Sequence, residues 1–282
     1  MAKSGRFVIY AVLLLAALFY LMPMYVMLST SLKSMDDIRN GGLLALPSAL
    51  DFTAWLKAWS GACTGIECSG LKPYFLNSVM MVVPAVLTST LLGAINGYVL
   101  TKWRFKGSDL IFSLMLFGVF MPLQVVLLPM SQTLGWLGLT ESIWGLVTVH
   151  VLMGIASTTL FFRNYYISIP DELVKAATLD GAGFFRIFWR IILPLSTPIF
   201  MVTLIWQFTN IWNDFLFGVV FSGADSKPIT VGLNNLVNTS TGVKEYNVDM
   251  AAAIIAGLPT MLVYLIAGKY FVRGLTAGAV KG

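Results

Sequence analysis

The chain has 282 residues, of which 57% are apolar and only 11% are charged. Soluble domains carry about 25% charged residues, so this composition excludes an ordinary soluble protein and indicates an integral membrane protein. The formal net charge is +5, and because the basic residues gather beside apolar segments, this charge calls for no nucleic-acid partner.

Six segments are long enough and apolar enough to cross about 30 Å of hydrocarbon as helices, which takes roughly 20 residues each. In chain order they are 7–29, 74–100, 110–130, 143–162, 191–213 and 250–271. Each is continuously apolar and does not alternate, which favours an all-α membrane fold over a β-barrel. The first segment is too long for a signal peptide and is expected to be retained as a helix.

The basic residues set the expected orientation of the chain in its membrane. If the N-terminus is cytoplasmic, twelve of the 18 Lys and Arg residues lie on the cytoplasmic side, mostly in short loops. The other six are spread over two long outer loops. Both termini are therefore predicted to be cytoplasmic, with some attraction of the inner basic residues to anionic membrane lipid.

Cysteine and histidine are rare in this chain. Cys63 and Cys68 lie in the first outer loop, where they form either a disulfide in an oxidising compartment or two free thiols. Neither has neighbouring His or carboxylate partners, so no metal site is predicted. The only histidine, His150, falls inside the fourth segment and is either a hydrogen-bonded packing residue or a proton relay.

No catalytic motif is present: the chain lacks a GxxxxGK[ST] phosphate loop, an HExxH pair and a GxSxG turn. A membrane enzyme is therefore disfavoured. The six segments also lack the buried charged residues that ion-coupled transporters use, since Asp214 lies at a helix end. Any transport must then draw its energy from another protein, which disfavours a secondary transporter or channel working alone.

The loop between the fourth and fifth segments contains a short polar helix that starts near Pro170, which suits a first helical turn. Ser168 and Asp171 form a loose capping pattern, and Asp171 or Glu172 can pair with Lys175 one turn later. The helix is either an amphipathic helix at the membrane interface or a docking surface for another protein.

One face of this short helix carries mostly small side chains, which would let another surface approach closely. The face consists of Leu173, Ala176, Ala177 and Asp180. Asp180 is expected to cap the next helix, with its carboxylate near the N–H groups of Ala182 and Gly183. Gly181 permits a sharp, left-handed turn between the two helices.

The segment PDELVKAATLDGAGFFRIFWRIILPLSTP, residues 170–198, resembles the EAA loop of permease subunits in bacterial ABC importers. The matching positions are Ala176, Ala177, Asp180, Gly181, Ala182, Leu193, Pro194, Leu195 and Pro198. Lys175 departs from the motif, which usually has Glu there. The stretches FMPLQVVLLPM, LGWLGLTES, WNDF and GLTAGAVKG are similar to the carbohydrate-uptake group, specifically its maltose-permease-like second subunit.

The resemblance implies the ABC importer permease fold, with six transmembrane helices and a cytoplasmic coupling helix, in the bacterial cytoplasmic (inner) membrane. The residues it assigns to contact with a separate ATPase are Glu172, Lys175, Ala176, Ala177, Asp180 and Gly181. It divides the chain into an N-terminal helix and periplasmic loop (1–72), a permease domain (73–272) and a cytoplasmic tail (273–282). The implied partners are a second permease, two ATPase subunits that hold ATP and Mg, and a periplasmic sugar-binding protein. The chain itself would bind no cofactor and hydrolyse no ATP.

The implied substrate is a sugar, and the sequence looks closest to permeases for monosaccharides of the glucose or mannose type. A permease of the same superfamily for glycerol phosphate or a polyol is the alternative. Polar and aromatic residues in the segments are candidates for the substrate pathway: Gln124, Trp206, Gln207, Asn210, Asn213 and Asp214. The competing interpretation is that these amides bridge helices and the tryptophans lie in the interfacial belt.

Overall fold

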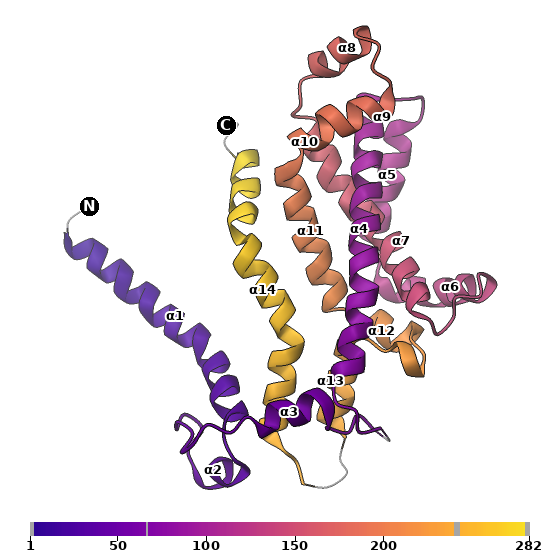
Figure 1. Ribbon diagram of the computed structural model, residues 1–282. Helices are drawn as coiled ribbons and strands as arrows, with labels where there is room; N and C mark the ends of the chain where they lie inside the picture. The colour runs from indigo at the N-terminus through magenta and orange to yellow at the C-terminus, as the bar shows by residue number, and fades with distance from the viewer. Residues whose placement is uncertain (1–2, 66, 240–242, 280–282) are drawn as a thin grey trace. The chain divides into compact units, whose positions relative to one another are not determined.

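The computed structural model describes residues 3–65, 67–239 and 243–279, and over these ranges it consists of helices joined by turns and loops (Figure 1). The predicted all-α class is therefore confirmed. The helices in chain order are α1 (Lys3–Ser31), α2 (Met35–Asn40), α3 (Thr53–Ser60), α4 (Lys72–Lys102), α5 (Ser108–Val119), α6 (Leu123–Trp136), α7 (Ile143–Tyr166), α8 (Asp171–Leu179), α9 (Phe184–Ile187), the π-helical turn η1 (Phe188–Ile192), α10 (Leu193–Leu195), α11 (Thr197–Trp212), α12 (Leu216–Phe221), the 3₁₀ turn η2 (Ala224–Ser226), α13 (Ile229–Asn238) and α14 (Tyr246–Ala279).

Four helices are each long and apolar enough to cross a membrane. They are Gly5–Ser31 within α1, the whole of α4, the whole of α7, and Tyr246–Gly268 within α14. These four correspond to the predicted segments 7–29, 74–100, 143–162 and 250–271. The last helix continues to Ala279, so residues 273–279, predicted as a tail, are helical, and residues 280–282 lie outside the described part of the chain.

The third predicted segment, 110–130, is not one helix. It divides into α5 and α6, whose axes differ by 106°. Pro122 occupies the break with an extended backbone, because proline has no N–H for the helix and disfavours helical geometry at the preceding residue. Pro129, which the sequence suggests as a second kink, lies inside α6 without ending it.

The fifth predicted segment, 191–213, begins too early, in the helical run that precedes α11. A bend of 80° separates the run Phe184–Leu195 from α11, and Ser196 stands at the break. Pro198 follows in the first turn of α11, where its missing N–H costs nothing. Residues 191–195 therefore extend the helical run that follows α8.

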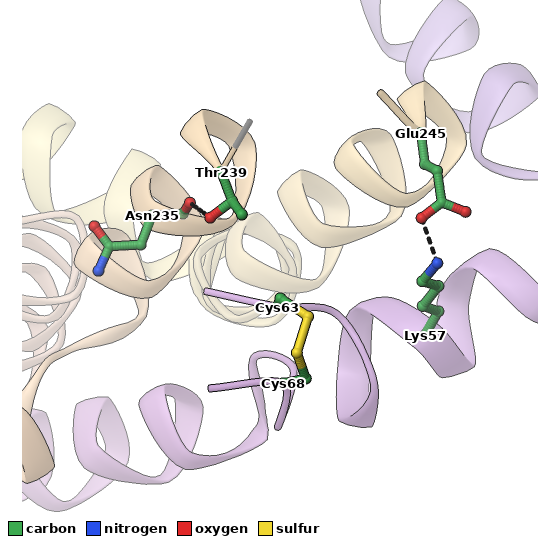
Figure 2. Close-up of a disulfide and its surroundings, with 6 residues drawn as sticks. All are labelled: Lys57, Cys63, Cys68, Asn235, Thr239 and Glu245. Atoms are coloured by element: carbon green, nitrogen blue, oxygen red, sulfur yellow. Dashed lines mark hydrogen bonds and ion pairs between the residues drawn. A yellow bond between two sulfur atoms is a disulfide. The ribbon is translucent and has the colours of Figure 1, made fainter. Parts of the chain in front are cut away.

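The chain packs into two compact units, and the first consists of Met1–Pro73 and Gly232–Leu258. Within this unit a disulfide joins Cys63 to Cys68, and Lys57 on α3 forms an ion pair with Glu245 just before α14 (Figure 2). The side chain of Asn247 also donates to the carbonyl of Lys33 at 3.0 Å. The disulfide closes a short loop, whereas the other two contacts join segments that are far apart in the sequence.

The second unit consists of Tyr74–Val231 and Pro259–Gly282. Its helices α4 and α7 approach closely, since a Cβ added at Gly93 would lie 2.2 Å from the hydroxyl of Thr158. That hydroxyl donates to the carbonyl of Ser89 at 2.9 Å. Small residues at a helix contact and hydroxyls bonded across it are typical of packing in membranes. The predicted domain limits do not follow this division, and they remain a prediction.

Candidate functional site

Helix α8 is the short polar helix predicted from the sequence. Pro170 is its N-cap residue and has no side-chain hydrogen bond to offer, while the hydroxyl of Ser168 donates to the carbonyl of Tyr165 at 2.7 Å. The predicted Ser168 cap is therefore not formed. Asp171 and Glu172 do lie in the first turn, where negative charge is favourable to the helix dipole.

The end of α8 is fixed by Gly181, whose φ of 77° is left-handed. Its N–H donates to the carbonyl of Thr178 at 3.0 Å, and the N–H of Ala182 donates to the carbonyl of Ala177 at 2.9 Å. These two bonds form a Schellman motif, in which glycine is the favoured residue. Because Ala182 already has a partner and α9 has no side-chain cap, the predicted capping role of Asp180 is wrong.

Lys102, the last residue of α4, attaches α8 to the rest of the second unit. Its ammonium lies 2.6 Å from Oδ1 of Asp171 and 2.5 Å from the carbonyl oxygen of Ile169. The Lys102 side chain is only 4% exposed, whereas that of Asp171 is 64% exposed. The hydrogen bond from Lys102 and its charge lower the pKa of Asp171, so this carboxylate stays ionised at neutral pH. The ion partner of Asp171 is therefore Lys102, not the predicted Lys175.

The two faces of α8 differ in exposure. Val174 and Ala177 are each 8% exposed and belong to a buried cluster with Tyr98 of α4, Phe162 of α7 and other apolar residues. The opposite face is exposed, and it contains Glu172, Leu173, Lys175, Ala176, Leu179, Asp180 and Gly181. Ala177, which the sequence analysis placed on the docking face, thus packs against the body of its own chain.

A cavity of about 350 Å³ lies beside the middle turns of α7. Its walls come from the end of α5, the start of α6, the middle of α7, the end of α11, the start of α12, and the short breaks that join α5 to α6 and α11 to α12. It brings together four of the six predicted pathway residues, Trp206, Gln207, Asn210 and Asp214. The other two lie elsewhere: Gln124 is exposed on α6, and the amide oxygen of Asn213 is 3.5 Å from the hydroxyl of Thr260.

Gln207 is the most deeply buried of these amides, with 2% of its surface exposed. Its Nε2 donates to the hydroxyl of Ser89 on α4 at 2.7 Å, so it joins α11 to α4. A Cβ added at Gly154 of α7 would lie 2.1 Å from the same nitrogen, so the close packing requires glycine there. For this residue the structure supports the interpretation of an amide that bridges helices.

His150 and Asp214 form a polar pair in the cavity that the sequence analysis missed. Nε2 of His150 lies 3.8 Å from Oδ2 of Asp214 and has no hydrogen-bond partner among the described residues, although the side chain is only 6% exposed. The carboxylate of Asp214 accepts the N–H groups of Phe217 and Gly218 at the start of α12. Of the two interpretations of His150, a hydrogen-bonded packing residue is not supported at Nε2, which has no such bond among the described residues. No local pattern could reveal the pair, because one member lies on α7 and the other in the loop between α11 and α12.

Comparison with known proteins gives consistent results. The family model described as binding-protein-dependent transport system inner membrane component matches residues 74–276. A probable ABC transporter permease protein of Pyrococcus horikoshii is 42% identical over 279 residues, 98% of each chain. A xylose/arabinose import permease protein of Haloferax volcanii is 31% identical over 96% of this chain and 92% of its own.

One solved structure is similar over nearly the whole chain. It is a bacterial ABC transporter involved in the import of the acidic polysaccharide alginate, and it matches with a TM-score of 0.82. The match covers 96% of this chain and 99% of the other at 23% sequence identity, so it establishes a shared fold.

Proposed function

This chain belongs to the family of binding-protein-dependent transport system inner membrane components, and from that premise we propose that it is the permease subunit of an ATP-driven sugar importer. The family match carries the proposal, because it covers 74–276 and so includes both α8 and the cavity. The sugar class is supported by relatives named for xylose, arabinose and alginate import. A cavity with an indole ring, an amide and a carboxylate suits such a solute.

In this proposal α8 is the surface through which a separate ATPase drives the permease. The exposed face of α8 includes the small residue Ala176, and the exposed turn Asp180–Gly181 follows the helix. These small groups would let another protein approach closely. ATP and Mg would be bound by that partner. A second permease and a solute-binding protein complete the proposed complex, with α8 and both termini on the cytoplasmic side and the binding protein on the other.

The attachment of α8 supports a mechanical role. Val174 and Ala177 pack into the same buried cluster as residues of α4, α7 and α9, and Lys102 ties the start of α8 to the end of α4. A force applied to α8 would therefore move α4 and α7 and would not simply bend a loop. Since α7 carries His150 into the cavity, the same helix connects the proposed ATPase contact with the proposed solute path.

The proposal predicts that an ATPase subunit covers Ala176. Both native cysteines are joined in a disulfide, so Ala176→Cys would introduce the only free thiol. We expect a maleimide to label Cys at this position readily in the two permease subunits alone, and at least about tenfold more slowly once the ATPases are bound. Lys106→Cys, on an exposed loop outside α8, is the matched control and should label at the same rate in both states.

Equal labelling of the two Ala176→Cys samples would contradict docking at α8. Loss of labelling at both positions would indicate general shielding by the complex and would also count against a specific contact. Because the measurement reports accessibility, it remains informative even if the cysteine variant transports poorly.

A further inference from the structure

The polar pair of His150 and Asp214 has hydrogen-bonding capacity that the fold leaves unused. Nε2 of His150 has no partner among the described residues although its side chain is more than nine-tenths buried. A buried polar atom without a partner is costly, and such atoms in native proteins call for an explanation. Both residues line the same cavity, so a ligand there would reach them together.

Asp214 is also only partly satisfied. Its Oδ1 accepts the N–H of Phe217 at 3.4 Å and its Oδ2 accepts the N–H of Gly218 at 3.1 Å. The backbone N–H of Leu216 also acts on this carboxylate, and because a carboxylate has about four acceptor positions, it can still accept a further hydrogen bond. The two backbone bonds fix the orientation of the carboxylate, which keeps Oδ2 directed at the histidine.

The separation of the pair fits one hydroxyl group. Nε2 and Oδ2 are 3.8 Å apart, which is too long for a direct hydrogen bond. An oxygen atom about 2.8 Å from each would complete a triangle with normal hydrogen-bond lengths. A hydroxyl can accept a hydrogen bond from Nε2–H and donate one to the carboxylate at the same time. The hydrogen bond to the carboxylate is charge-assisted and therefore strong.

We propose that His150 and Asp214 together bind a single hydroxyl group of the transported sugar in this cavity, and so give this subunit its own part in substrate selection. Trp206 and Asn210 also line the cavity: the indole would contact the apolar face, and the amide oxygen of Asn210, whose nitrogen donates to the carbonyl of Trp206, would accept from a second hydroxyl. We assign Gln207 to helix packing, since its amide nitrogen donates to Ser89. A metal ion is a poor alternative occupant, because one carboxylate and one imidazole make an incomplete ligand set.

This inference rests on the proposed function, so the experiment must separate the two. The full complex, with ATPases and binding protein, is placed in proteoliposomes, and uptake is measured for glucose, mannose, xylose, arabinose and their disaccharides. The best substrate is then compared with its monodeoxy analogues, with the binding protein saturated by each sugar in turn. If the wild-type complex moves none of the sugars, the sugar-import proposal itself is overturned.

We expect the wild-type complex to move one monodeoxy analogue about tenfold less efficiently than the parent sugar, since a lost hydrogen bond in a buried site costs about that much. His150→Phe keeps the ring contact with Phe217 but removes both nitrogens. It should lower uptake of the parent to the level of that analogue and so abolish the discrimination. His150→Gln keeps a donor near the position of Nε2 and should restore most of it.

Thr148→Val is the matched control, because it removes a polar group on the same helix whose hydroxyl bonds to the carbonyl of Trp144 and which does not line the cavity. It should leave both uptake and discrimination unchanged. Should the phenylalanine variant not assemble, His150→Ala serves in its place. Uptake of the parent sugar with undiminished discrimination in the variant without the imidazole would overturn the inference, whereas a loss of discrimination that glutamine repairs would support it.

Discussion

Helix α8 follows the C-terminal end of α7, whereas the polar cavity is lined by the middle turns of α7, and the two regions are specified in different ways. Helix α8 has nine residues, and its acidic first turn and terminal glycine are visible in one short stretch of sequence. The cavity is assembled from five helices and depends on residues that are far apart in the chain. Local sequence therefore predicts the first region well and the second only in part.

The two regions also differ in how they use polar groups. The charges of α8 are exposed, apart from the buried ammonium of Lys102 that anchors it. The cavity instead holds buried polar side chains, of which Gln207 is bonded within the fold and His150 has a nitrogen without a partner among the described residues. Changes at α8 should thus affect the coupling of transport to ATP, while changes in the cavity should affect which sugar is moved.

Among changes in these two regions, Gly181→Val is expected to reduce sugar uptake the most. The left-handed φ of 77° disfavours any L-residue and β-branched residues most, at a cost of about 2 kcal/mol. No atom lies within 4 Å of an added Cβ, so the cost is conformational and not steric crowding. Uptake should fall about thirtyfold, the change that this free energy implies, with no change in sugar preference, as measured in proteoliposomes.

Gly181→Asn is the matched control, because asparagine tolerates the left-handed region far better than valine. It should retain most of the uptake. If valine and asparagine had equal effects, the turn geometry would not be what matters at this position.

Lys102→Met should have a smaller effect on the same region. Methionine preserves the packing of the buried stem but loses the bonds to Asp171 and to the carbonyl of Ile169. We expect about a fivefold loss of uptake, since hydrogen bonds to a charged group contribute roughly 1.5–3 kcal/mol and Asp171 can regain water. Lys106→Met removes the same charge from an exposed position and should be silent. An equal loss in both variants would point to general charge instead of the anchor.

The sequence predicts α1, α4, α7 and α14 because a continuous apolar run must form a helix in lipid. It misplaces the breaks at Pro122 and Ser196, because a bend leaves the apolar composition of a segment unchanged. The motif-based expectation of an ABC importer permease is confirmed at the level of family and fold. The individual coupling residues stay predictions.

The contacts that sequence reasoning missed share one cause. Lys102 with Asp171 and His150 with Asp214 each join residues that are far apart in the sequence and meet only in the folded chain. Spacing rules consider neighbours within one helix, so they paired Asp171 with Lys175, which lies one turn away. A single sequence gives no signal that favours the distant partner. The contact can be seen only once the helices are packed together.

The smallest effect on transport is expected from Gln207→Leu, which sharpens the distinction between committed and available polar groups in the cavity. Leucine fills a similar volume and loses the 2.7 Å hydrogen bond to Ser89. The Ser89 hydroxyl keeps its bond to the carbonyl of Ala85, so the loss should be near the average of about 0.6 kcal/mol for such bonds in membranes. The thermal unfolding temperature of the purified complex should shift slightly downward, and Ser89→Ala should add nothing to the leucine variant.

The KM for sugar should change less than about twofold on the same energy scale, because the amide of Gln207 contributes to helix packing and not to substrate binding. A large rise in KM without loss of stability would instead place Gln207 beside His150 on the sugar path.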